Sequence, residues 1–344
     1  MTHSQPRVSI VIPCRNEEAY IGRCLDSIVR ADYPADRIEI LIVDGCSDDR
    51  TREIVADYAT RYRGIRLLDN PDRIVPAALN LGIRAATGDV IVRMDAHAVY
   101  PPEYLPRLLD ALATSGADNV GAPIVTLPAD DTVLARAIAL GLSHRHGVGN
   151  SYFRIGSAVD RWVDTVAFGC WRREVFSRIG LFDEELPRNQ DDEFNHRLRR
   201  HGGRIRLVSG VAARYYARRS LRHVARMFYQ YGFFKPLVAR KVGRIMTLRQ
   251  LVPAAFLLTV AGAIGAATVT SWPLVAVLGS YGTVLGTAAA GAVGRHGWRC
   301  ALLLPLVLAV LHVSYGLGYL HGVARHVVGL GRARADARTL ALSR

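Results

Sequence analysis

The sequence has 344 residues and a formal net charge of +14, from 44 Lys and Arg against 30 Asp and Glu. This length suits one large domain or two ordinary ones, with a substantial buried core. The basic residues gather around apolar segments near the C-terminus, which argues against a nucleic-acid partner and favours contact with the anionic lipids of a membrane.

Cysteine usage indicates a reducing compartment. The five cysteines form no CxxC pair and show no metal-ligand spacing; they are Cys14, Cys24, Cys46, Cys170 and Cys300. Free thiols of this kind are typical of a cytosolic domain. The N-terminal segment MTHSQPR contains no apolar run, so we expect no signal peptide.

Apolar strands alternate with helical segments over the first part of the chain. Strands are expected at residues 8–13, 38–45, 65–70 and 90–92, and helices at residues 16–31, 47–62 and 74–87. Ser47 is the expected N-cap of the second helix. This alternation predicts an α/β fold with a doubly wound, mainly parallel sheet covered by helices on both faces.

Polar side chains follow three of these strands. Arg15 comes after the first strand, Asp44 ends the second, and Asp95 and His97 follow the fourth. Because ligands bind outside the carboxyl ends of strands in such sheets, we expect these residues to converge. Asp44 could accept hydrogen bonds from a base or ribose, and a cation held by Asp95 and His97 could neutralise a diphosphate. The segment PCRNEE replaces a glycine-rich phosphate loop, which argues against NAD or FAD.

Each of these residues also has a purely structural explanation. Asp44 and Gly45 could form only a turn. Asp95 and His97 could belong to a surface turn before the two prolines that follow. Their joint position at strand ends favours a binding site over these alternatives.

The C-terminal third predicts membrane helices. Residues 251–294 and 301–324 contain no Lys, Arg, Asp or Glu, which is enough for about three spans, with residues 270–273 as a turn. Basic and aromatic residues alternate just before them, as in a helix that lies on anionic lipid. The expected organisation is a cytosolic catalytic domain at 1–220, interfacial helices at 221–249, transmembrane helices at 250–324 and a basic tail at 325–344.

Several motifs in order resemble those of family 2 glycosyltransferases, which have the GT-A fold and use nucleotide-sugar donors with inversion. The motifs are VSIVIPCRNEEAYIGRCLDSI, IEILIVDGCSDDRT, AALNLGIRAATGDVIVRMDAH, GCWRREVFSRIGLFDEEL and NQDDEFNHRLRRHGGRI. The sequence is most similar to membrane-bound enzymes of bacterial exopolysaccharide assembly of the succinoglycan type. The QxxRW motif of processive synthases is absent, so the resemblance implies transfer of one sugar rather than polymerisation.

The resemblance implies roles for individual residues. Asp44 matches the acid that contacts the uracil or ribose, and Asp95 matches the first acid of the metal-binding DxD motif. His97 departs from the usual third acid, but an acid-x-His pair can still hold Mn²⁺ or Mg²⁺. Asp191 matches the catalytic base. A helix that begins near residue 190 would also aim Asp191 at the cleft and rotate Asp192 about 100° away.

Other site residues are implied by the same motifs. Contacts with the nucleotide sugar are expected from Pro13, Arg15, Asn16, Glu17, Asp44, Asn80, Arg93 and Asp95. Contacts with the acceptor or the diphosphate are expected from Gly169, Gln190, Asp192, Arg218, Arg226, Gln230 and Lys235. From residue types alone, the acids at 191–193 are also explained as a solvated helix N-terminus.

The expected function is inverting, metal-dependent transfer of one sugar to a lipid-linked, polyprenyl diphosphate acceptor at the cytoplasmic membrane, in polysaccharide or glycolipid assembly. Two alternatives stay open: a polyprenyl-phosphate sugar synthase, and a non-catalytic sugar-nucleotide binding protein anchored in the membrane. Three spans would place the arginine-rich tail outside, against the positive-inside tendency. Either the tail breaks this tendency, or one apolar segment is re-entrant or interfacial.

Overall fold

The computed structural model describes residues 5–245 and 247–329. It divides into two compact units. Unit 1 comprises Met1–Val125 and Tyr152–Tyr215, and unit 2 comprises Thr126–Ser151 and Tyr216–Arg344. The expected basic tail at 325–344 lies mostly outside the described residues.

Unit 1 is built around an eight-stranded sheet of order β3-β2-β1-β4-β9-β6-β10-β8. These strands are β1 (Val8–Cys14), β2 (Ile38–Asp44), β3 (Ile65–Asp69), β4 (Val90–Arg93), β6 (Asn119–Gly121), β8 (Arg161–Trp162), β9 (Cys170–Arg172) and β10 (Ile205–Leu207). The strands from β3 to β4 are parallel, whereas β9 is antiparallel to both neighbours. A small second sheet has the order β5-β11-β7, from β5 (Ala98–Val99), β11 (Ala213–Tyr216) and β7 (Ile124–Leu127).

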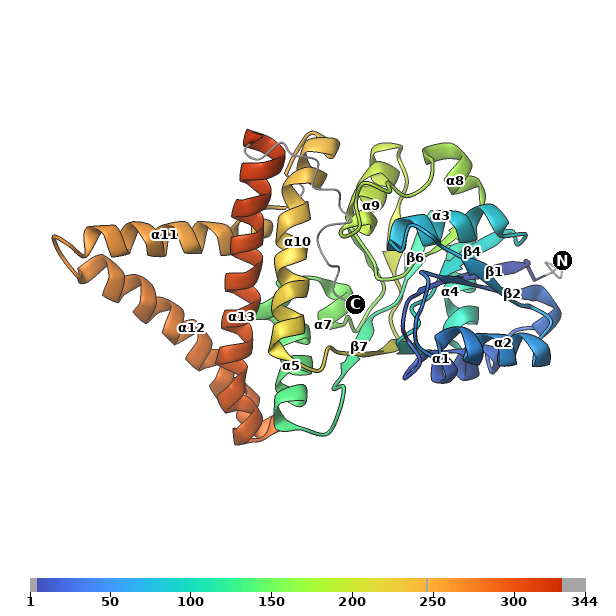
Figure 1. Cartoon of the computed structure of the whole chain (residues 1–344), viewed down its shortest axis with the longest axis horizontal. Coiled ribbons are helices and arrows are strands. Elements are labelled where there is room, and N and C mark those ends of the chain that lie inside the picture. Colours follow the sequence, from blue (N-terminus) through green and yellow to red (C-terminus); the bar gives the residue numbers. More distant parts are fainter. Residues whose placement is uncertain (1–4, 246, 330–344) are drawn as a thin grey trace. The chain divides into compact units, whose positions relative to one another are not determined.

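Helices cover both faces of the large sheet (Figure 1). One face packs against α1 (Ile21–Val29), α2 (Thr51–Arg61) and α4 (Tyr104–Thr114), and the other against α3 (Val75–Ala85), α8 (Glu174–Ile179) and α9 (Gln190–Arg200). Unit 1 also contains η1 (Ala35–Arg37) and α7 (Tyr152–Ile155). The predicted doubly wound α/β fold is confirmed.

The strand sequences explain why the sheet is covered twice. Ile10 and Ile12 of β1 belong to one core, and Val11 between them belongs to the other. Because successive side chains point to opposite faces, a strand that carries apolar side chains on both faces must be buried on both sides. All seven residues of β1 are buried.

The start of α2 corrects one expectation. The helix begins at Thr51 rather than beside Ser47, and Arg50 occupies the N-cap position without a side-chain cap bond. Ser47 does not cap the helix because its hydroxyl donates to Asp44 and accepts from the backbone N–H of Asn16. The residues before α2 therefore form a polar loop at the sheet edge.

Unit 2 differs from the expected organisation because it includes residues 126–151. This segment carries α5 (Val133–Ser143) and α6 (Arg145–Val148), which pack on α13 (Trp298–Val323). Nε2 of His312 lies 2.7 Å from the carbonyl oxygen of His146. A continuous unit over 1–220 is thus interrupted, because the apolar face of α5 is buried with the C-terminal helices.

Helix α13 is the centre of unit 2. It packs against α5, α11 (Val252–Ala266), α12 (Trp272–His296) and most extensively α10 (Leu221–Val242). Glycine makes this last contact possible, since a Cβ at Gly318 would overlap the carbonyl oxygen of Tyr229. The expected interfacial segment is therefore mainly one long helix packed along α13, followed by η2 (Leu248–Gln250).

Two C-terminal helices are long and apolar enough to cross a membrane. They are Trp272–His296 and Trp298–Val328, the second of which includes the π-helical η3 (Ala324–Val328). The third apolar helix, α11, has 15 residues and a length of about 22 Å, less than the roughly 30 Å of a hydrocarbon core. The structure therefore supports two of the three expected spans.

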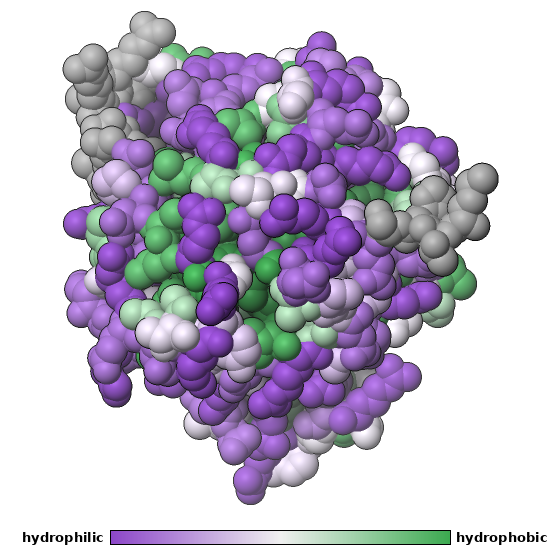
Figure 2. Space-filling model, turned by 90° about the vertical axis from the view of Figure 1, so that its right-hand side faces the viewer, coloured by the Kyte–Doolittle hydropathy of each residue, from purple (hydrophilic) through white to green (hydrophobic). Residues whose placement is uncertain are grey.

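The surfaces agree with this division. The side of the molecule that carries β1 and β2 in Figure 1 is mainly hydrophilic, with a smaller group of hydrophobic residues near the centre of Figure 2. In contrast, α12 and α13 expose large apolar side chains, among them Trp272 at 73% and Leu302 at 70%. Exposed apolar surface of this kind suits contact with lipid rather than water.

Candidate active site

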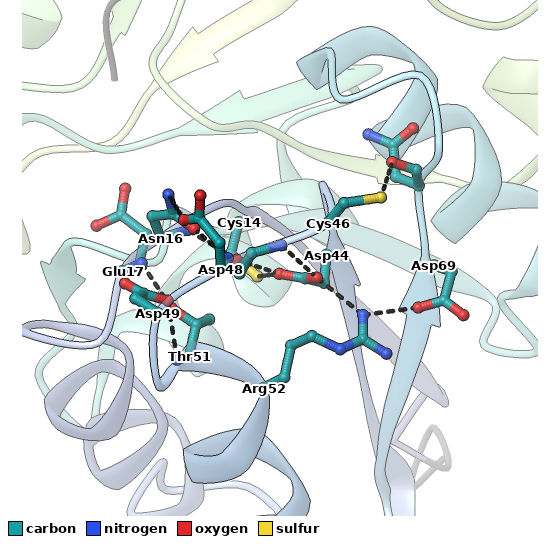
Figure 3. A network of polar contacts seen from close by, with 12 residues as sticks. Cys14, Asn16, Glu17, Asp44, Cys46, Asp48, Asp49, Thr51, Arg52 and Asp69 are labelled. Carbon is teal, nitrogen blue, oxygen red and sulfur yellow. Dashed lines mark hydrogen bonds and ion pairs between the residues drawn. The ribbon is translucent and has the colours of Figure 1, made fainter.

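The polar residues predicted from strand ends do meet at one edge of the sheet. Cys14 at the end of β1 lies in register with Asp44 at the end of β2, and Arg93 at the end of β4 lies beside Val11. Figure 3 shows the loops after β1 and β2 joined by a network of hydrogen bonds. Left-handed backbone at non-glycine residues recurs in the loops around the sheet: Asn16, Cys46, Arg73, Phe168 and Asn189. Such strained positions cluster at functional sites.

The carboxylate of Asp44 is fully buried and fully occupied. Its Oδ2 accepts from the backbone N–H of Ser47 at 3.0 Å and from Nη1 of Arg52 at 2.9 Å. Its Oδ1 accepts from the Ser47 hydroxyl, and the Cys14 thiol lies 3.7 Å away. Asp44 can therefore contact a bound ligand only if Arg52 or Ser47 moves.

The loop after β1 is held by the segment before α2. The amide of Asn16 pairs with Asp48, and the backbone N–H of Glu17 donates to the Thr51 hydroxyl at 2.7 Å (Figure 3). Arg15 is exposed, and its side chain lies beside the Cα of Gly45. Arg15 is therefore accessible to solvent after the end of β1.

Arg93 lies between two acids from different elements. Its Nη1 is 2.5 Å from Oδ1 of Asp191, at the start of α9, and its Nη2 is 3.6 Å from Oδ1 of Asp95. Only 9% of the Arg93 side chain is exposed. Burial alone would lower the pKa of Arg93, but the two carboxylates raise it, so the guanidinium stays charged.

The carboxylate of Asp191 is largely desolvated, but part of its side chain is exposed to solvent. Burial raises its pKa above the ordinary value for Asp, and the Arg93 guanidinium only partly offsets this effect. About a third of the side chain is still exposed. A carboxylate with a raised pKa and access to solvent is suited to accept a proton from a bound group.

His97 is enclosed by Glu17 and two tyrosines. Its Nδ1 lies 3.2 Å from Oε1 of Glu17, although without hydrogen-bond geometry, and its ring packs on Tyr215 with 4.7 Å between centroids. The Tyr20 ring is 6.5 Å away. Burial lowers the pKa of His97, but Tyr215, Glu17 and Asp95 together raise it to about 10.

The donor atoms near β4 fit a divalent cation only in part. Within the described residues, no group of three or more His, Cys, Asp or Glu side chains is arranged to hold a metal. However, both ring nitrogens of His97 are buried without a hydrogen-bond partner in the part of the chain that the structure describes. Because the raised pKa keeps His97 protonated, a cation would have to displace that proton before the imidazole could bind it. One carboxylate from Asp95 and one neutral imidazole then suit Mn²⁺, which accepts oxygen and nitrogen ligands and can take the rest from phosphate and water.

Comparison with known proteins identifies the family. The model for glycosyl transferase family 2 matches residues 9–179. The succinoglycan biosynthesis protein ExoA of Rhizobium meliloti is 32% identical over 314 residues, which cover 90% of this chain and 93% of that protein. The chain belongs to glycosyl transferase family 2. It is a glycosyltransferase, as the resemblance implied.

Two further similarities concern the fold and the kind of pathway. The mannosyltransferase PcManGT from Pyrobaculum calidifontis, solved in complex with GDP-Man and Mn²⁺, shares the GT-A fold with a TM-score of 0.59, at 23% identity over 91% of this chain and 87% of that one. The dolichyl N-acetyl-alpha-D-glucosaminyl phosphate 3-beta-D-2,3-diacetamido-2,3-dideoxy-beta-D-glucuronosyltransferase of Methanococcus voltae is 27% identical over 240 residues, 68% of this chain and 74% of that protein. Family 2 relatives of this chain thus act in polysaccharide or lipid-linked glycan assembly.

The remaining predicted family 2 site residues fall into different surroundings. The backbone oxygen of Gly169 accepts from the N–H of Arg93 at 3.0 Å, and Gln190 is the buried first residue of α9, next to Asp191. Asn80 instead bonds to both backbone groups of Phe182, so its amide supports the fold of that loop.

The other expected contacts keep their status as predictions. Pro13 is buried within β1, and Asp192 follows Asp191 in the first turn of α9. Four of the seven expected acceptor or diphosphate contacts belong to unit 2, just before or on α10: Arg218, Arg226, Gln230 and Lys235. Of these, Arg226 is exposed and Gln230 is buried.

Sequence reasoning missed two residues that shape this family 2 site. Arg52 covers Asp44, and Asn195 fixes α9 through a hydrogen bond of 2.8 Å from Nδ2 of Asn119. Asn195 stands inside the NQDDEFN motif and could have been noticed, since a buried amide in a helix needs a partner. The sequence around Arg52 does not indicate its role, because an arginine on a helix is usually exposed to solvent.

Proposed function

We propose that this protein is an inverting, metal-dependent glycosyltransferase that moves one sugar from a nucleotide diphosphate sugar to a lipid-linked acceptor, a polyprenyl diphosphate, at the cytoplasmic face of the inner membrane. Its family membership supports sugar transfer. The finer statement depends on one observation: Arg93 joins Asp191 on α9 to Asp95 at the end of β4. This pairing brings a candidate base close to a candidate metal ligand.

Inversion needs a single base. The acceptor hydroxyl attacks the anomeric carbon from the face opposite the leaving diphosphate, so one carboxylate must accept its proton and no covalent intermediate forms. Asp191 has the required features, a raised pKa and a partly exposed side chain at a helix N-terminus. Its neighbour Asp192 follows in the same turn, where it points about 100° further round the helix.

The leaving diphosphate needs positive charge. Asp95 and His97 would hold Mn²⁺ or Mg²⁺, and the bound ion would stabilise the charge on the departing phosphate. Arg15, exposed beside Gly45, could contact the same phosphates. Asp44, together with Arg52 that covers it, would contact the nucleoside.

The membrane association is proposed from unit 2. Two helices have the length and composition of spans, and α10 carries cations next to aromatic residues. A lipid diphosphate acceptor carries negative charge that Arg218, Arg226 and Lys235 would attract. The short helix α11 suits the interfacial or re-entrant segment better than a third span.

The test is a screen of nucleotide sugars with the detergent-solubilised full chain and a membrane lipid extract. The quantity measured is the release of nucleoside diphosphate. We expect one nucleotide sugar to be consumed only when lipid is present. NMR of the product should show that the anomeric configuration is inverted relative to the donor. Donor consumption with a lipid monophosphate alone would indicate a polyprenyl-phosphate sugar synthase instead. Donor binding without turnover would indicate a non-catalytic protein.

Paired variants test the base. Asp191→Asn should keep donor affinity and lower the transfer rate by about 10² to 10⁴, because the acceptor hydroxyl loses its proton acceptor. Asp192→Asn is the matched control and should stay substantially active. The reverse pattern would assign the base to Asp192. Full activity in both variants would show that this segment does not supply the catalytic base.

A further inference from the structure

The side chain of Arg93 connects two parts of the site that come from distant segments. Its two terminal nitrogens face different carboxylates, Asp95 at 3.6 Å and Asp191 at 2.5 Å. The two arms of a guanidinium are rigid with respect to each other, so they fix the separation of the groups that they contact. Nε of Arg93 is buried and has no hydrogen-bond partner among the described residues.

Both ends of this connection are anchored. The N–H of Arg93 donates to the carbonyl of Gly169 at 3.0 Å, and the next N–H, of Met94, donates to Val11 at 3.0 Å. The end of β4 is therefore held by strands on each side. This backbone cannot shift easily when a ligand binds.

Helix α9 is anchored by a chain of buried amides. Asn119 Nδ2 donates to Asn195 at 2.8 Å, and Asn195 Nδ2 donates to the Thr165 hydroxyl at 2.9 Å. The Phe194 ring stacks on Phe182 with 4.4 Å between centroids. These contacts fix the helix axis, but they do not touch the carboxylate of Asp191, which projects from the first turn.

We propose that Arg93 is a positioning residue for Asp191 rather than a ligand of the nucleotide sugar. It holds the base carboxylate in one orientation and at a fixed separation from Asp95, the donor-side acid. This inference rests on the proposed role of Asp191. A misplacement of the base by about 1 Å can lower the rate by about 10²-fold, so holding its orientation has a large effect on turnover and a small one on donor affinity.

The experiment compares Arg93→Met, Arg93→Lys, Asp191→Asn and the double variant Arg93→Met with Asp191→Asn in the solubilised full chain. For Arg93→Met we expect kcat to fall about 10²-fold while the KM for the donor and the affinity for nucleoside diphosphate change by less than about threefold. Arg93→Lys should recover part of kcat. In the Asp191→Asn background, Arg93→Met should cost no further activity.

Arg172→Met is the matched control. Arg172 is an arginine on the neighbouring strand β9 whose guanidinium donates to the backbone oxygens of Leu112 and Ala117, away from both acids. The Arg172→Met substitution should lower the melting temperature without changing kcat per folded molecule. If Arg93→Met does not fold, Arg93→Lys decides by the same split between kcat and KM.

Three outcomes overturn parts of this scheme separately. A rise in donor KM with unchanged kcat would make Arg93 a donor ligand and refute the inference. Losses that multiply in the double variant would show that Arg93 and Asp191 act independently, with the same consequence. Full activity of Asp191→Asn would refute the proposed base itself, and the inference with it.

Discussion

Nη1 of Arg52 lies 2.9 Å from the buried carboxylate of Asp44 and 2.7 Å from the exposed carboxylate of Asp69. The side-chain hydrogen bonds that Arg52 donates to these two acids raise its pKa. The guanidinium therefore closes the end of β2 and remains reachable from solvent.

The first prediction concerns this pair. Arg52→Met should lower the melting temperature, because the fully buried Asp44 loses a charge-assisted hydrogen bond that contributes about 1.5–3 kcal/mol. Arg50→Met is the control, since the Arg50 side chain forms an exposed ion pair with Glu53 and exposed pairs contribute little. Thermal unfolding of the two variants side by side gives the comparison. Equal shifts would mean that Arg52 does not stabilise Asp44.

The second prediction concerns the metal. Asp95→Ala and an excess of chelator should each abolish transfer, because the leaving diphosphate loses its counter-charge. His97→Asp should stay active and shift its preference from Mn²⁺ toward Mg²⁺, since imidazole suits Mn²⁺ better. The measurement is nucleoside diphosphate release at matched metal concentrations. Undiminished turnover in chelator would rule out a metal requirement.

The third prediction concerns pH. Burial raises the pKa of Glu39, but hydrogen bonds from Ser9 and Thr87 outweigh this effect and leave the pKa below the usual value. A group with a lowered folded-state pKa stabilises the protein above the unfolded-state pKa, and this stabilisation is lost as pH falls. Glu39→Gln should thus reduce the melting temperature at pH 7, and the difference should shrink below about pH 4.3. A difference that is independent of pH would contradict this origin.

The fourth prediction concerns α13. Gly318→Ala should lower the melting temperature, because the added Cβ would overlap the carbonyl oxygen of Tyr229 on α10. Gly286→Ala is the control: it lies in α12 with no atom near the added Cβ, and alanine favours a helix over glycine. If both variants melt at the wild-type temperature, α10 and α13 do not pack closely in the solubilised protein.

Much of unit 1 could be predicted from the sequence because its patterns are local. The four expected strands and α9 begin where the sequence predicts, whereas α1 begins at Ile21, five residues after its expected start. Phe194 and Leu198, four residues apart on α9, are both buried. The start of α2 was wrong because Ser47 has two possible uses. Its hydroxyl bonds to the buried Asp44, and a local pattern cannot weigh that distant partner against a cap.

Contacts between distant segments were not predictable from local patterns. The pairing of Arg93 with Asp191 joins residues 98 apart, and nothing in either segment specifies the other. The same holds for α5, whose apolar face gave no indication of the C-terminal helices as its partner. Charge-free length also does not distinguish a long apolar helix from a short one, and α11 ends at Ala266 after 15 residues.

The discontinuity of unit 2 has a consequence for biosynthesis. His146 contacts a helix residue that is translated 166 residues later. At about 5–20 residues per second, the ribosome needs roughly 8–33 s to reach that point. During this interval the apolar face of α5 lacks its partner α13, and the chain has still to add β8, β9 and β10 to the large sheet. Helix α13 therefore sets the earliest time at which unit 2 can complete its fold.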